Sequence, residues 1–118
     1  MALHFVTQEP AELLAVIKKA ITEGKIVTWS CDQDGDFTHT AAQWKNKAWL
    51  RPRVRTGELV MNILGSRNQV MTKEVYAIYH GRFVEMVLAH ADRYFTTATA
   101  SAMLEVGDVV GGPKATVS

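Results

Sequence analysis

Basic side chains recur at alternate positions of residues 45–55, and a tryptophan stands among them. In an extended strand every second side chain points to the same face. One face of this segment therefore gathers Lys45, Lys47, Trp49, Arg51, Arg53 and Arg55. Because basic groups contact phosphates and aromatic rings stack on bases, this basic row predicts binding of single-stranded nucleic acid or another polyanion. The alternative is a solvated strand whose charges are balanced by Glu58 and an acidic loop.

Aromatic and histidine side chains recur at helical spacing between Thr72 and Phe95. The set consists of Tyr76, Tyr79, His80, Phe83 and His90. Apolar walls with a few polar groups are typical of a small-molecule pocket, which we expect between this helix and a sheet. His80 and His90 are not expected to share a metal ion, because the helix between them separates them by roughly 15 Å. The alternative is that these residues are core side chains with hydrogen-bond partners.

Three aspartates, Asp32, Asp34 and Asp36, have the spacing of the first ligands in a calcium-binding loop. Such a loop needs glycine at its sixth position and glutamate at its twelfth. This segment instead has Gly35 at its fourth position and Gln43 at its twelfth. We therefore interpret it as a hairpin loop and predict no metal site.

No pattern in the sequence points to a particular reaction. Cys31, the single cysteine, precedes the acidic loop, where negative charge raises the pKa of a thiol and disfavours a nucleophile. Nucleophile elbows, phosphate-binding glycine loops, dinucleotide fingerprints and metalloprotease motifs do not occur. We therefore predict no catalytic residue and no cofactor, and favour a non-enzymatic binding or interaction protein over an enzyme of unknown reaction.

Two amphipathic helices and four strands would position these residues. Apolar residues at spacings of three and four predict a first helix from Thr7 to Gly24 and a second from Thr72 to about Phe95. Segments rich in β-branched and aromatic residues predict strands over residues 26–31, 37–44, 47–54 and 58–64. Short polar connections favour a sequential antiparallel meander, so the predicted fold class is α+β in the order α-β-β-β-β-α. Pro52 lacks a backbone N–H group, which predicts that the third strand is an edge, bulged or broken.

The second helix has an apolar arc of roughly 200°, which is wider than one sheet face needs. Either the first helix or a second subunit would cover the excess, and we predict a homodimer. Gly81 in the middle of this helix costs roughly 1 kcal/mol relative to alanine, which indicates the close approach of a strand, a partner helix or a ligand.

The composition is that of an ordinary globular chain. Its 118 residues are 47% hydrophobic and 21% charged, and the formal net charge of +1 gives no global field for a polyanion. This length predicts a single domain, assigned to residues 1–110, and residues 111–118 are predicted to be a disordered tail. The chain starts without a recognisable leader, has no stretch of roughly 18 apolar residues and has one cysteine. We therefore expect a cytoplasmic protein without a membrane partner.

Overall fold

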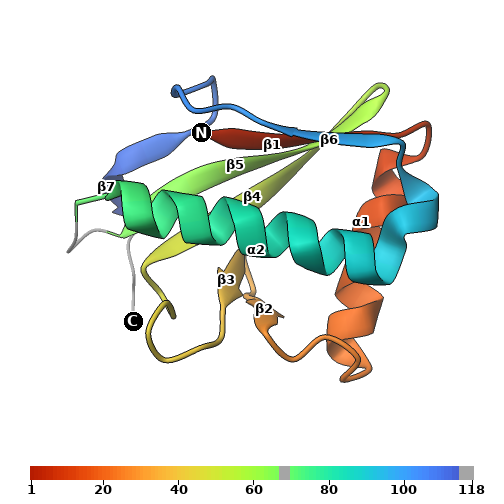
Figure 1. The fold of residues 1–118 in the computed structure, drawn as a ribbon, viewed down its shortest axis with the longest axis horizontal. Helices are drawn as coiled ribbons and strands as arrows, with labels where there is room; N and C mark the ends of the chain where they lie inside the picture. Colours follow the sequence, from red (N-terminus) through yellow and green to blue (C-terminus); the bar gives the residue numbers. More distant parts are fainter. Residues whose placement is uncertain (67–69, 115–118) are drawn as a thin grey trace.

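The computed structural model describes residues 1–66 and 70–114 as one sheet with two α-helices (Figure 1). In chain order the elements are β1 (Ala2–Val6), α1 (Pro10–Thr22), β2 (Trp29–Cys31), β3 (Phe37–His39), β4 (Ala48–Arg55), β5 (Glu58–Ser66), α2 (Lys73–Ala91), the 3-10 helix η1 (Asp92–Tyr94), β6 (Thr97–Ala100) and β7 (Val109–Lys114). The predicted α+β class with two helices and an antiparallel sheet is confirmed. Within the described ranges, no helix is long and apolar enough to cross a membrane.

The sheet has seven strands, so the prediction of four is wrong. Hydrogen-bonded strands follow the order β2-β3-β4-β5-β1-β6, and β7 pairs with β5. All of these pairs are antiparallel except that of β5 with β7. β1 lies along β5 from Ala2↔Asn62 to Val6↔Glu58, and β7 meets the next part of β5 at Leu64↔Val109. The predicted order α-β-β-β-β-α therefore lacks one strand at the start and two at the end.

The C-terminal part of the chain is more regular than predicted. The sequence indicates that order fades after Phe95, but β6 and β7 both lie in this part. β6 pairs with β1 and β7 pairs with β5, so distant strands supply a backbone ladder that local composition does not indicate. Residues 111–114 of the predicted tail belong to β7, and residues 115–118 lie outside the described residues. The single domain over residues 1–110 stays a prediction.

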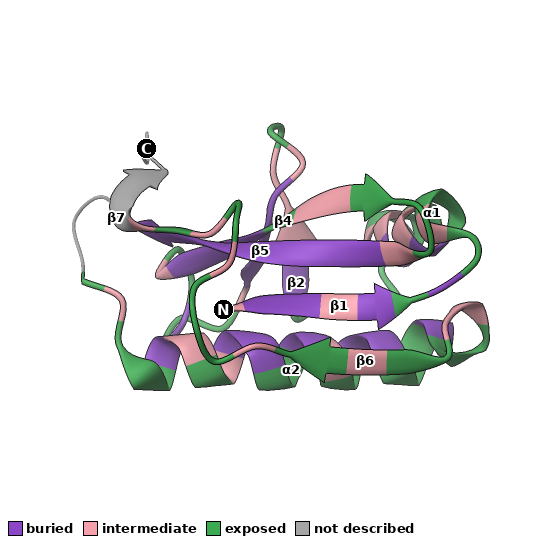
Figure 2. Cartoon of the chain, turned by 90° about the horizontal axis from the view of Figure 1, so that it is seen from above, coloured by how far each residue is buried: buried purple, intermediate pink, exposed green. Residues whose placement is uncertain are grey.

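The hydrophobic core lies between the sheet and the two helices. α2 runs across one face of the sheet, and Figure 2 shows that the side of α2 turned towards the sheet is buried, as is most of β5. Phe83 of α2 makes edge contacts with Trp29, Phe37 and Phe5 at centroid distances of 5.0, 5.6 and 6.2 Å. Such ring pairs bury large apolar surfaces. They fix α2 above the junction of the short β2–β3 hairpin with the longer strands.

β4 contains Pro52 without a break. Its register with β5 runs from Ala48↔Gly65 to Arg55↔Glu58, whereas β3 pairs with it only at Phe37↔Leu50. Beyond Leu50 the β3 side of β4 has no strand partner among the described residues. Pro52 therefore removes no ladder hydrogen bond on that side, which is the position where a strand tolerates proline.

The two helix starts differ in how well local sequence signals them. Thr72 caps α2 as predicted, because its hydroxyl accepts the Val75 N–H at 3.2 Å. α1 begins at Pro10 rather than at Thr7. The Thr7 hydroxyl accepts the Glu9 N–H at 3.0 Å and donates to the Tyr94 carbonyl at 2.6 Å. Thr7 thus joins the start of α1 to the end of η1.

Candidate functional site

The five residues predicted to line one pocket are divided between the core and the surface. Tyr79 and Phe83 have no exposed surface, and His80 is only 4% exposed. Tyr76 is half-buried and its hydroxyl donates to a backbone carbonyl at 2.9 Å, whereas His90 is exposed. Tyr79, His80 and Phe83 therefore belong to the packed core, which is the alternative given above, and the five do not share one cavity.

Most polar side-chain atoms in this part of the core form hydrogen bonds within the protein. The Tyr79 hydroxyl lies 3.0 Å from the Thr38 hydroxyl and donates to the Trp44 carbonyl, and burial raises the pKa of Tyr79. His80 Nδ1 donates to the Tyr76 carbonyl at 3.0 Å, and burial lowers the pKa of His80. Its Nε2 is buried without a hydrogen-bond partner among the described residues. His80 is therefore a neutral core side chain.

A cavity of about 230 Å³ lies where α2 faces β2 and β3, and we call it the hairpin cavity. Its walls are Thr28, Trp29, His39, Arg82, Glu85, Met86, Ala89 and His90. This cavity lies between α2 and the sheet, and a ligand pocket there stays a prediction. Of the five predicted lining residues, His90 alone lines it.

His39 of β3 lines the hairpin cavity and carries one hydrogen-bond donor on its ring. Its Nδ1 accepts the Ala41 N–H at 3.1 Å, so the proton of the neutral ring lies on Nε2. Burial, with the nearby charge of Arg82, lowers the pKa of His39 and keeps the ring neutral at pH 7. The Nε2–H group has no hydrogen-bond acceptor in residues 1–66 and 70–114. His39 lines the hairpin cavity and is 3% exposed.

Opposite charges stand on the helical wall of the hairpin cavity. Arg82 and Glu85 lie one turn apart on α2, and both side chains are exposed. Neither forms an ion pair with a described residue. Trp29 and Met86, which are 2% and 5% exposed, supply apolar surface. The hollow therefore combines a cation, an anion, a neutral N–H donor and an apolar floor.

The basic row on β4 does not present an exposed tryptophan. Trp49 is 5% exposed and Trp44 is 6% exposed, with the Lys47 Nζ 5.7 Å from the Trp44 ring centre. Arg51 donates to both carboxylate oxygens of Asp36, at 2.8 and 2.7 Å. Base stacking on Trp49 therefore requires a change of conformation, and the charge of Arg51 is already paired.

Other side chains of the basic row also lie next to protein groups. Arg53 donates through Nη2 to the Val106 carbonyl at 3.3 Å, and its Nε is buried without a partner among the described residues. Arg55 lies opposite Glu58 in the β4–β5 register, and Lys45 is exposed. The arrangement resembles the balanced strand of the alternative interpretation more than an open polyanion surface.

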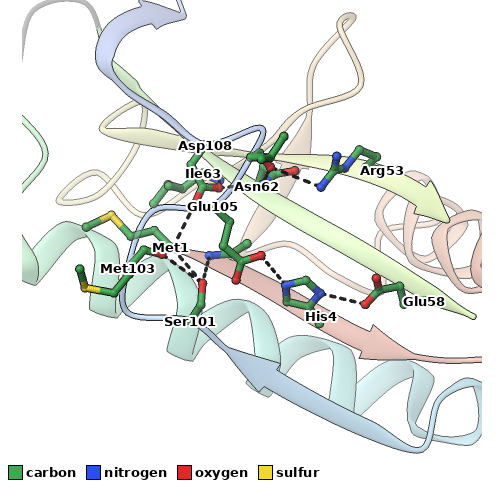
Figure 3. Close-up of polar contacts among 12 residues, drawn as sticks. Met1, His4, Arg53, Glu58, Asn62, Ile63, Ser101, Met103, Glu105 and Asp108 are labelled. Atoms are coloured by element: carbon green, nitrogen blue, oxygen red, sulfur yellow. Dashed lines mark hydrogen bonds and ion pairs between the residues drawn. The ribbon is translucent and has the colours of Figure 1, made fainter.

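Residues 101–108, here called the strap, bind the sheet face turned away from α2, and no spacing in the sequence indicates this contact (Figure 3). Asp108 is its anchor, because this buried carboxylate accepts the Asn62 side-chain N–H at 2.8 Å, the Ile63 N–H at 3.2 Å and the Glu105 N–H at 2.7 Å. Burial raises the pKa of Asp108, but these hydrogen bonds outweigh it and the net pKa is lowered. Asp108 therefore stays charged and holds the strap on β5.

His4 forms a second attachment of the strap. Its Nδ1 lies 2.8 Å from Glu58 of β5, and its Nε2 lies 2.8 Å from Glu105 of the strap (Figure 3). Burial lowers the pKa of His4, but the hydrogen bonds to the two carboxylates outweigh it and raise the net pKa. His4 thus links strands and strap through charge-assisted contacts.

The acidic loop between β2 and β3 has the form of a hairpin connection. Carboxylate oxygens of Asp32, Asp34 and Asp36 all lie within 4.8 Å of one another. Asp32 Oδ1 accepts the N–H groups of Asp34 and Asp36 at 2.9 and 3.0 Å, as aspartates in tight loops do. Burial raises the pKa of the neighbouring Cys31 thiol. The geometry fits the hairpin-loop interpretation.

Gly81 has open space around it. A Cβ atom added there would meet no atom within 4 Å among the described residues outside its own helix turns. The close neighbour expected from this glycine is therefore not supplied by the described part of the chain, and the homodimer stays a prediction.

No protein-family model, no curated protein and no solved structure matches this chain.

Proposed function

We propose that the chain binds a small polar organic molecule in the hairpin cavity. The observation that carries this proposal is the convergence of His39, Arg82 and Glu85 on one hollow of about 230 Å³ with an apolar floor. An apolar pocket with a few placed polar groups is the usual form of a ligand site. The three polar groups come from two separate elements, β3 and α2, and none of them forms an ion pair with another described residue.

The size of the hairpin cavity favours a small ligand. Pockets for drug-sized molecules span about 300 to 1,000 Å³, and this cavity of about 230 Å³ is smaller. Its lining includes exposed side chains of α2, so a ligand can reach it without opening the core. A compact metabolite therefore suits the site better than a nucleotide or a peptide.

Binding without a chemical reaction is the function that these residues support. Cys31 is not among the residues that line the hairpin cavity, and the raised pKa of its thiol disfavours a thiolate. His39 already accepts a backbone N–H at Nδ1, so its Nε2–H group can donate a hydrogen bond to a ligand but the ring has no free lone pair to act as a base. Polyanion binding by the basic row is the weaker candidate, because Trp49 is buried and Arg51 is paired with Asp36.

The test is a thermal-shift screen with a library of small polar fragments, repeated on two filling variants. Ala89→Phe fills the hairpin cavity, whereas Ala11→Phe places the same ring at an exposed position of α1 away from the cavity. Because a ligand that binds only the folded state raises its stability, we expect fragments that stabilise the wild type and Ala11→Phe but not Ala89→Phe. A screen without stabilisers, or equal stabilisation of Ala89→Phe, would overturn the proposal.

A further inference from the structure

Arg82 and Glu85 place a positive and a negative group on the same wall of the hairpin cavity. They lie three residues apart on α2, where side chains are neighbours, yet neither is paired with the other or with another described charged group. Two unpaired opposite charges above one hollow define a pattern that a ligand can match.

We infer that the ligand of the hairpin cavity is a small zwitterion, a molecule with a carboxylate and an ammonium group together, such as a free α-amino acid; this inference rests on the proposed binding function. A carboxylate meets the Arg82 guanidinium, whose planar fork matches it, and takes a further hydrogen bond from the His39 Nε2–H. The ammonium group meets the Glu85 carboxylate. The substituent between them lies against Met86 and Trp29.

The charges of the cavity separate this class from simpler ones. A plain anion would be attracted by Arg82 but repelled by Glu85, and a plain cation would meet the reverse situation. A neutral apolar molecule would leave both charges and the His39 N–H without a partner, and such unmatched polar groups weaken binding. A zwitterion satisfies all three groups at once, and a compact amino acid is consistent with a cavity of about 230 Å³.

The experiment is titration calorimetry with alanine, valine, leucine and methionine as probes. Each free amino acid is compared with its N-acetyl derivative, which lacks the ammonium charge, and with its amide, which lacks the carboxylate. Because each blocked form loses one charge-assisted contact, we expect both to bind about tenfold or more weakly than the free amino acid. Chemical-shift changes at His39, Arg82 and Glu85 would place the bound amino acid in the hairpin cavity.

Two variants assign each charge to its residue. Arg82→Gln is expected to weaken binding of the free amino acid and of the N-acetyl derivative about tenfold, and to leave binding of the amide unchanged. Glu85→Gln is expected to weaken binding of the free amino acid and of the amide, and to leave binding of the N-acetyl derivative unchanged. Arg93→Gln, an exposed arginine of η1 that does not line the cavity, is the matched control and should leave all three unchanged.

The outcomes separate this inference from the proposed function. If an N-acetyl derivative or an amide binds in the cavity as tightly as its parent, the zwitterion inference is overturned and the binding function stands. The same holds if no amino acid binds but polar fragments of another class do. If neither amino acids nor fragments bind, both fail.

Discussion

His4 and Glu105 are 101 positions apart in the sequence, yet the His4 Nε2 lies 2.8 Å from a Glu105 oxygen. The other ring nitrogen, Nδ1, lies 2.8 Å from Glu58. A neutral imidazole has one N–H group, so it can donate to only one of the two carboxylates, whereas the imidazolium ion donates to both. The attachment of the strap to β1 and β5 is therefore complete only when His4 is protonated.

This contact predicts that the strap loosens as pH rises. The folded state raises the pKa of His4 above 6.5, so the contribution of His4 to stability is fully present below pH 6.5 and is lost as pH rises through the raised pKa. Glu105 acts in the opposite direction. Its pKa is lowered from 4.5 by the nearby Ser101 hydroxyl and by His4, so its contribution is present above pH 4.5 and is lost as pH falls. The strap should be held most firmly between these limits.

Amide hydrogen exchange of residues 101–108, expressed as protection factors, measures this opening. We expect protection of the strap to fall between pH 6 and pH 9 in the wild type and to stay level in His4→Gln. An equal fall in His4→Gln would show that another group controls the strap.

Asp108 is predicted to be the most sensitive position of the strap. Asp108→Ala removes one acceptor from three part-buried N–H donors, among them the side chain of Asn62 and the backbone of Ile63. A fully buried donor without an acceptor costs about 1 to 3 kcal/mol, and these donors are only part-buried. We therefore expect urea denaturation to show a total loss of about 2 to 4 kcal/mol in the free energy of unfolding. The lowered pKa of Asp108 means that the wild-type advantage is present above pH 3.8 and lost as pH falls below it.

The matched control for this loss is Asp92→Ala, because Asp92 is exposed and a surface change of this kind stays within about 0.5 kcal/mol. Equal stabilities of Asp108→Ala and Asp92→Ala at pH 7 would contradict an anchoring role for Asp108.

A comparison of two glycines with similar backbone conformations distinguishes the stability cost of backbone strain from that of steric contact. Gly107 and Gly57 have φ values of +100° and +82°, which L side chains rarely adopt. A Cβ atom added at Gly107 would lie 2.6 Å from the Asn62 side-chain oxygen, whereas one added at Gly57 would meet nothing within 4 Å. Both Gly→Ala changes should lose about 1 kcal/mol to backbone strain, and Gly107→Ala should lose more because Asn62 must move. Thermal unfolding of the two variants checks this, and an equal loss would exclude the contact with Asn62 as a cause.

Elements with strong local signals could be predicted from the sequence. Thr72 before a run of apolar residues at helical spacing indicates the start of α2, and segments with β-branched and aromatic residues indicate the two long strands β4 and β5. The missed strands lack such signals. β1 has only five residues, Ala2–Val6, and β6 consists of alternating threonine and alanine, so pairing with distant strands rather than local composition makes them strands.

The sequence predicted a pocket beside the second helix but not the residues that line the hairpin cavity. The aromatic and histidine residues of the second helix predicted a pocket between that helix and the sheet, but spacing alone does not reveal which flank of the helix meets the β2–β3 hairpin. Tyr79 and Phe83 fell on the covered flank, while Arg82 and Glu85 fell on the flank that joins His39. His39 comes from a strand of three residues, and its role depends on a hydrogen bond to Ala41 that only the folded turn creates.

The burial of the tryptophans predicts how the chain responds to single-stranded nucleic acid. All three tryptophans, Trp29, Trp44 and Trp49, are described, and none is more than 6% exposed. Because stacking on a base requires an open ring face, we expect an oligonucleotide at low salt to leave the tryptophan fluorescence unchanged. Anisotropy of a labelled oligonucleotide, which detects contacts to phosphates without stacking, is expected to show no binding that depends on Arg51 and Arg53. Salt-dependent quenching that disappears in the Arg51→Ala, Arg53→Ala double variant would instead make the basic row of β4 the functional surface, and would require that Arg51 leave Asp36 on binding.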